Sequence, residues 1–174
     1  ETAEMAIQAA LTGHLVLSTL HTNDAPSAIT RMLDLGVPAY LINSTLLGVM
    51  AQRLVRTLCP HCKKAVQPRE DQRAAWRSLV APWKSAEPTQ IWLPVGCLEC
   101  RMTGYTGRVG IYEILVNSPE IRRQIKPLTE IPKLREQAFR EGMRPLRISG
   151  ALKVAQGITS LEEVIKVAPP SDEG

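Results

Sequence analysis

Four cysteines, arranged as two pairs, are the residues of this sequence whose spacing most clearly indicates chemistry. Cys59 and Cys62 form the first pair, and Cys97 and Cys100 form the second. Two such pairs can bring four thiolates to the corners of a tetrahedron, which is the geometry of a structural zinc site. We therefore predict that all four bind one zinc ion. Basic residues directly beside them would offset the negative charge of the centre: Lys63, Lys64 and Arg101.

Other uses of paired cysteines stay open on spacing alone. Two disulfides would suit a secreted protein, but the sequence shows no signal-peptide pattern and no apolar run near the roughly 18 residues that cross a bilayer. A thiol oxidoreductase is a further alternative, but the pairs come as a set and neither clearly opens a helix behind a strand. Zinc in a cytoplasmic protein is therefore favoured over both.

A zinc-ribbon module that binds nucleic acid is the alternative function. The net charge of +4 arises from 21 basic and 17 acidic residues spread along the chain. Aromatic residues make up only 4% of it, and no dense run of Lys and Arg with interleaved aromatics occurs. We therefore expect no specific nucleic-acid partner.

The elements that must position these residues follow from hydrophobic periodicity and turn signals. Before the cysteines we predict a helix over 2–12 and then a buried strand of a parallel sheet over 14–20. A second helix, capped by Asn23 or Asp24, should end at Gly36. A helix over 38–50 and a strand over 53–58 should follow it. Beyond them we predict a helix over 71–79, an extended piece over 91–93, a strand over 108–116 and helices over 120–125, 131–141, 145–156 and after Thr159 or Ser160.

His21 begins the polar loop that follows the predicted strand. Open α/β sheets bind ligands in the loops at the carboxyl ends of parallel strands, so an imidazole there could donate a hydrogen bond to a phosphate oxygen. Thr22 and Asn23 could add polar contacts. The pattern alone favours a structural role for a histidine at a strand end, and His14, at the other end of the strand, has a still weaker case.

Several stretches resemble the secretion ATPase superfamily, the hexameric motors of type II secretion and type IV pilus assembly. Residues 1–3, which begin at Glu1, together with residues 12–24 resemble the family's histidine box. The resemblance continues in the family's order through residues 52–56, the four cysteines, and residues 104–113, 141–144 and 156–163.

This resemblance implies an α/β fold: the C-terminal half of a RecA-like P-loop NTPase domain with an inserted tetracysteine zinc module and a C-terminal helical cap. The implied division is 1–58 for the ATPase core, 59–100 for the insertion, and 101–174 for the returning strand and the helices. His21 matches the family's second histidine, which lies near the γ-phosphate of ATP, so it is the implied catalytic residue. His14 and Arg53 are implied in nucleotide binding, and the family's tetracysteine module implies that Cys59, Cys62, Cys97 and Cys100 are metal ligands.

The implied function is that of a C-terminal fragment of an ATPase that powers type IV pilus assembly or type II secretion. Retraction-type pilus motors generally lack the cysteines, which favours an assembly or secretion motor. The implied cofactors of the intact protein are ATP and Mg²⁺ beside zinc. The implied partners are five further copies in a homo-hexamer and an inner-membrane platform protein, with the motor cytoplasmic and peripheral to the bacterial inner membrane.

The sequence departs from the family at the phosphate site. It contains no GxxxxGK[ST] motif, so no loop of backbone amides with a lysine can cradle the β- and γ-phosphates, and the acidic Walker B segment is absent too,. We expect a fragment of a longer protein, which alone neither binds ATP tightly nor hydrolyses it.

Overall fold

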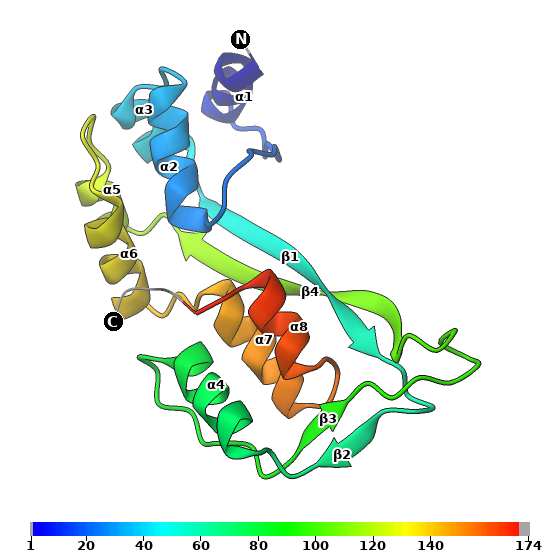
Figure 1. The fold of residues 1–174 in the computed structure, drawn as a ribbon. Helices are drawn as coiled ribbons and strands as arrows, with labels where there is room; N and C mark the ends of the chain where they lie inside the picture. Colours follow the sequence, from blue (N-terminus) through cyan, green and yellow to red (C-terminus); the bar gives the residue numbers. More distant parts are fainter. Residues whose placement is uncertain (1, 171–174) are drawn as a thin grey trace. The chain divides into compact units, whose positions relative to one another are not determined.

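The computed structural model describes residues 2–170 of the chain; Glu1, with which the resemblance begins, lies outside them. The elements follow one another as α1 (Thr2–Leu11), α2 (Ala25–Asp34), α3 (Ala39–Thr45), β1 (Gly48–Leu58), β2 (Lys64–Val66), α4 (Glu70–Val80), β3 (Ile91–Leu93), β4 (Tyr105–Val116), α5 (Pro119–Gln124), α6 (Ile131–Arg140), α7 (Leu146–Ala155) and α8 (Leu161–Val167) (Figure 1). They form two compact units, and the paired strands β1 and β4 belong partly to each.

Unit 1 comprises Glu1–Ala51 and Glu113–Arg144. Its helices pack α2 against α3 and α6, and α1 against α3. Along β4 the buried residues Glu113 and Leu115 alternate with the exposed Ile114 and Val116, as expected for a strand with one face in a core,. The core consists of Ala25, Ile29, Val37, Ile42, Leu115, Ile121, Ile125, Leu134, Ala138 and Met143.

Unit 2 comprises Gln52–Tyr112 and Pro145–Gly174. Strands β2 and β3 pair antiparallel, with Ala65 opposite Trp92. Helix α7 contacts α4, α8 and β3. Gly150 permits the close approach of α7 to α8, because a Cβ atom there would lie 2.4 Å from Val164 Cγ1. The buried residues of this unit include Val55, Leu58, Trp76, Leu79, Ile91, Val154 and Val164.

Most predicted helices are confirmed, and two caps are now resolved to a single residue. Asp24, not Asn23, caps α2, since its carboxylate accepts a hydrogen bond from Ser27 N. Ser160, not Thr159, caps α8 in the same way through Glu163 N. The α/β class is also confirmed.

The boundary between α3 and β1 was predicted wrongly. The helix ends at Thr45 and the strand begins at Gly48, within the stretch expected to be helical. Asn117 explains the difference: its side-chain amide donates to Leu46 O at 2.9 Å and its backbone N donates to Leu47 O at 3.0 Å. These contacts with the end of β4 replace further helical hydrogen bonds. Strand β2 was not predicted at all.

The predicted buried strand over residues 14–20 is wrong, and so is the parallel sheet. These residues form neither helix nor strand, and Leu15 and Leu17 are 75% and 89% exposed. A parallel strand needs neighbouring strands for its hydrogen bonds. Within residues 2–170 the two sheets pair β1 with β4 and β2 with β3, and neither includes this segment. No helix in that range is long and apolar enough to span a bilayer.

Candidate metal centre and histidine segment

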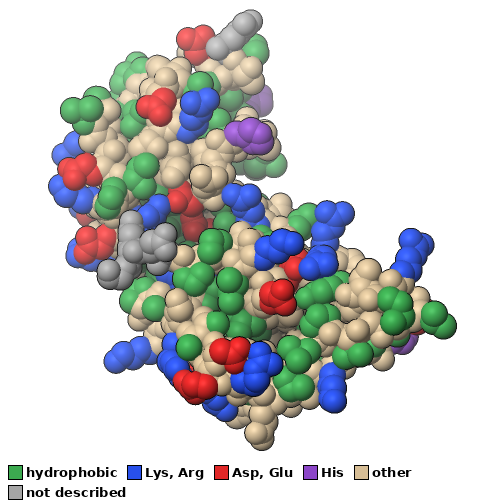
Figure 2. All heavy atoms as spheres, in the orientation of Figure 1, with side chains coloured by type: hydrophobic (Ala, Val, Ile, Leu, Met, Phe, Trp, Pro, Cys, Tyr) green, Lys and Arg blue, Asp and Glu red, His purple; other side chains and the backbone are tan. Residues whose placement is uncertain are grey.

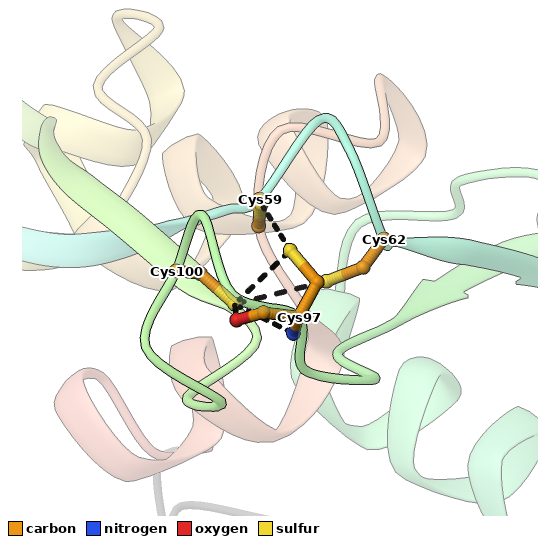
Figure 3. Close-up of side chains that lie close together, drawn as sticks. All are labelled: Cys59, Cys62, Cys97 and Cys100. Carbon is orange, nitrogen blue, oxygen red and sulfur yellow. Dashed lines mark hydrogen bonds between the residues drawn. The ribbon is translucent and has the colours of Figure 1, made fainter.

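The side chains of the four cysteines converge on one point (Figure 3). Cys59 and Cys62 lie in the loop after β1, and Cys97 and Cys100 lie in the loop between β3 and β4. All four Sγ atoms lie within 4.8 Å of one another. The separation is 3.8 Å between Cys59 and Cys97, 3.9 Å between Cys62 and Cys100, and 3.7 Å between Cys97 and Cys100.

These distances fit a tetrahedral metal ion. A Zn–S bond of about 2.3 Å in a regular tetrahedron places the sulfurs about 3.8 Å apart. All four cysteines are free, and the sulfur atoms are too far apart for disulfides, whose bond length is about 2.05 Å,. The cluster could therefore hold one metal ion through four thiolates, which is the donor set preferred by zinc among the ions common in proteins,.

Tight turns aim both pairs of thiols inward. In the first loop, Lys63 N donates to Cys59 O at 3.0 Å. In the second loop, Met102 N donates to Cys97 O at 2.8 Å. Met102 and its neighbour Arg101 have φ values of 63° and 53°, which residues other than glycine seldom adopt,. The second loop thus turns back on itself through two left-handed residues directly after Cys100.

Backbone amides supply the inner polar contacts of the cluster. Gly96 N donates to Cys62 Sγ at 3.3 Å, while Cys97 N and Gly104 N donate to Cys100 Sγ at 3.2 and 3.1 Å. Burial acts to raise the pKa of Cys100, but the hydrogen bonds from these two amides and from neighbouring thiols outweigh it and lower the pKa to about 6. These amides therefore favour the thiolate of Cys100, the form that binds metals. At Cys97, by contrast, a hydrogen bond from the backbone of Cys100 is outweighed by burial and the neighbouring thiols, which raise the pKa of that thiol to about 11.

Arg56 and Glu163 hold the strand that leads to Cys59 through a long-range ion pair that no local sequence pattern indicates. The carboxylate of Glu163 accepts hydrogen bonds from Arg56 N, Nε and Nη2 at 3.1, 3.0 and 2.7 Å. The Arg56 guanidinium also stacks 4.1 Å from the ring centroid of Tyr105. The side chain of Arg56 is 48% exposed, but that of Glu163 is only 7% exposed, so the pair is partly shielded from solvent. The pair joins β1 to α8.

Further hydrogen bonds hold the first cysteine loop within unit 2. Leu58 N donates to Ile158 O at 2.8 Å, and Cys59 N donates to Gly104 O at 2.9 Å. Lys63 Nζ donates to Gly157 O at 2.7 Å and lies 5.7 Å from the Trp92 ring centroid. Lys63 was expected only to offset metal charge; it also connects its loop to the turn that precedes α8.

The predicted nucleotide-site residues lie on other parts of the chain. His14 and His21 are exposed residues of unit 1, and Arg53 is an exposed residue of β1 within unit 2. The His14 Nδ1 atom lies 3.1 Å from Thr12 Oγ1 and 3.3 Å from Ala9 O, so its contacts are with the end of α1. The roles predicted for these three residues stay predictions.

Comparison with known proteins identifies the relatives of the chain. Residues 1–166 match the family model described as Type II/IV secretion system protein. The chain is 53% identical over 169 residues to the type IV pilus assembly ATPase TfpB of Acinetobacter baylyi, covering 97% of this chain and 28% of that protein. It is 46% identical over 175 residues to the type II secretion system ATPase E of Vibrio cholerae, covering 98% and 33%.

A solved structure supports the fold. The pilus retraction motor PilT with bound ADP aligns over 99% of this chain and 38% of its own, with a TM-score of 0.60 and 24% sequence identity. That likeness shows the fold alone. The chain spans about a third of the length of the relatives above, namely 28% and 33%.

Proposed function

Since the chain belongs to the type II/IV secretion system protein family, we propose that it is the C-terminal part of a hexameric ATPase that powers type IV pilus assembly or type II secretion. The observation that carries this proposal is its identity of 53% and 46% to ATPases named for those two machines, over nearly its whole length. In the proposed division, residues 1–58 belong to the ATPase core, 59–100 form the metal-binding insertion and 101–174 contain the returning strand and helical cap.

His21 is the proposed catalytic residue. It is exposed, and only Thr22 and Asn23 separate it from Asp24, the cap of α2, so its imidazole is free to meet a phosphate supplied by another part of the protein. His14 and Arg53 are proposed to contact the nucleotide as well. Because the sequence holds no P-loop, the residues that bind the phosphates and Mg²⁺ come from outside this chain in the proposed protein,.

The four cysteines are proposed to hold zinc. Its chemistry there would be structural, as four thiolates fill the coordination shell and leave no position for substrate. The backbone amides of Gly96, Cys97 and Gly104 would stabilise the metal-bound sulfurs, because they donate hydrogen bonds to Cys62 and Cys100. The turns hold the loops that join β1 to β2 and β3 to β4.

The proposed partners are further copies of the same protein and an inner-membrane platform protein, with the motor at the cytoplasmic face of that membrane. A nucleic-acid-binding zinc ribbon is less well supported, because the family relatives match the whole chain and not the cysteine module alone. Figure 2 also shows acidic side chains interspersed among Lys and Arg on the face that it draws. Binding to DNA or RNA that weakens steeply with salt would favour the ribbon instead.

The deciding experiment uses the full-length protein. We expect Mg²⁺-dependent ATP hydrolysis by a hexamer, measured as phosphate release together with mass determination in solution. His21→Ala should lower kcat about 100-fold, the typical cost of removing one group that stabilises a transition state. His61→Ala, an exposed histidine between the first two cysteines, is the control and should leave kcat unchanged. Absence of hydrolysis in the full-length protein would overturn the proposal.

A further inference from the structure

Asp24, three residues after His21, is held from two directions. Its Oδ1 atom accepts a hydrogen bond from Ser27 N at 2.8 Å, which caps α2. Its Oδ2 atom accepts one from Arg135 Nη2 on α6 at 2.6 Å. The side chains of Arg135 and Asp24 are 27% and 24% exposed, so this ion pair is largely shielded from solvent. The histidine segment therefore ends at a residue that is tied to a helix 111 positions further along the chain.

Glu113 secures the same end of α2 from β4. It is 5% exposed, and its Oε1 atom accepts a hydrogen bond from Ala25 N at 2.9 Å. The next residue, Pro26, has no N–H group. The first-turn amides of Ala25 and Ser27 are thus both taken by carboxylates, which also suit the positive end of the helix dipole,. The start of α2 is a fixed anchor and does not offer these amides to a phosphate.

The link from this anchor back to His21 is short. Thr22 Oγ1 donates to Asp24 O at 3.2 Å and closes the loop on itself. His21 therefore sits next to a closed turn whose far end is clamped by Arg135. Residues 14–20, on the other side of His21, are in neither helix nor strand and contribute no such constraint.

We propose that Arg135 is a positioning residue for His21: through Asp24 it ties the histidine loop to α6, so that the placement of the imidazole depends on that helix. The significance for ATP hydrolysis rests on the proposed function, whereas the positioning itself rests only on these contacts. Arg135 lies outside the short motifs by which the sequence resembles the secretion ATPases, although it lies within residues 1–166, which the family model matches. Its role depends on a contact between residues far apart in the chain.

The test of positioning uses this chain itself, which contains His14, His21 and His61 as its three histidines. Two-dimensional NMR of the imidazole nitrogens resolves each ring. We expect Arg135→Gln to shift or broaden the His21 signals and to leave those of His61, in unit 2, unchanged. Arg135→Lys, which keeps the charge, should restore most of the original spectrum. The control is Arg140→Gln, which breaks an exposed pair with Glu136 on the same helix and should leave His21 unaltered.

Unchanged His21 signals in a folded Arg135→Gln chain would overturn the proposal, as would an equal shift in Arg140→Gln. If Arg135→Gln fails to fold, as judged by circular dichroism, Arg135→Lys and Asp24→Asn decide the question in the same spectrum. Asp24→Asn keeps an oxygen for Ser27 N and removes the charge that faces Arg135.

A second arm separates this inference from the proposed function. In the full-length protein, Arg135→Gln should lower kcat about 10- to 100-fold, the cost of a displaced catalytic group, with little change in KM for ATP. If the His21 signals shift but neither Arg135→Gln nor His21→Ala lowers kcat, the positioning holds and the catalytic role proposed for His21 fails. If His21→Ala lowers kcat while Arg135→Gln changes neither kcat nor the spectrum, the positioning fails alone.

Discussion

The tetracysteine loops and the histidine segment are both recognised by residue types at fixed spacing, yet they differ in how complete they are. The four thiols meet within 4.8 Å of one another, in loops held by backbone hydrogen bonds within unit 2. The histidine segment, residues 14–24, forms neither helix nor strand, and Leu17 is 89% exposed. This chain brings all four cysteine ligands together, whereas it exposes the histidine segment without folding it into a helix or a strand.

The difference lies in the number and origin of the partners that each motif needs. A metal site needs four ligands and two turns, all of which lie between β1 and β4. A buried parallel strand needs hydrogen bonds and apolar cover from neighbouring strands, and a segment without them stays open however apolar its residues are. Each of the following predictions tests whether this chain supplies all the partners of the tetracysteine loops but not those of the histidine segment.

Metal removal should have the largest effect. Zinc binding contributes about 10–16 kcal/mol to the folding of zinc-finger peptides, so its loss should cost unit 2 several kcal/mol. We expect one zinc per chain by elemental analysis. After chelation, hydrogen exchange should show lost protection in β2, β3 and the second cysteine loop, and retained protection in α2 and α6.

Variants within the second loop provide the control for this prediction. Cys97→Ser should lose the metal and its protection together. Leu98→Ser, at an exposed position between two ligands, should keep both. Full protection of β2 and β3 in the metal-free chain would show that unit 2 needs no ion, and the contrast with the histidine segment would then rest on packing alone.

The sequence predicted what depends on local pattern. The cysteine set, a cap at Asn23 or Asp24 and the positions of most helices follow from spacing, because ligand pairs and helix caps involve residues within a few positions of one another,. The short motifs that resemble the secretion ATPases also pointed to the family that the comparisons show. For these features the structure adds geometry to an assignment that was already available.

What the sequence missed depends on contacts between distant residues. The end of α3 is set by Asn117, some 70 residues after it, and no periodicity within residues 38–50 carries that information. The pair of Arg56 with Glu163 is equally non-local. The strand over 14–20 failed for the complementary reason: its composition indicates a strand, but the described residues provide no strand to pair with it. Local pattern cannot tell whether a partner is present.

Glu163→Gln should have the next largest effect, on the framework behind Cys59. Losing the charge-assisted hydrogen bonds to Arg56 should lower the free energy of unfolding of unit 2 by about 2 kcal/mol at neutral pH. Urea titration followed by tryptophan fluorescence measures this, since Trp76, Trp83 and Trp92 all belong to unit 2. The control is Glu120→Gln, which breaks an exposed pair with Arg123 and should cost under about 0.5 kcal/mol,.

The difference in free energy of unfolding between the wild-type chain and Glu163→Gln should also depend on pH. The hydrogen bond from Arg56 holds the pKa of Glu163 below its ordinary value of 4.5, so the unfolded chain takes up this proton at a higher pH than the folded chain does. The stabilisation is therefore complete above about pH 4.5 and is lost as the pH falls toward the lower, folded pKa. The difference between the wild-type chain and Glu163→Gln should therefore shrink as the pH falls from about 5 to about 3,. A difference that stays constant over this range would contradict the assignment.

Asp24→Ala should have a smaller effect, confined to the anchored end of the histidine segment. Loss of a carboxylate cap costs about 1–2 kcal/mol, and we expect the amides of α2 to lose that much protection against hydrogen exchange,. Ser118→Ala, which removes the cap of α5, is the matched control and should lower protection in α5 without affecting α2. Equal protection of α2 in both variants would show that Glu113 alone secures its start.

Leu17→Ala should have almost no effect on this chain, and that makes it the sharpest test of the comparison. At 89% exposure the side chain has little to lose, so we expect a change within about 0.5 kcal/mol,. Leu134→Ala, at a fully buried position of unit 1, should cost about 2–5 kcal/mol in the same urea titration followed by circular dichroism,. If Leu17→Ala is equally costly, the segment is already packed.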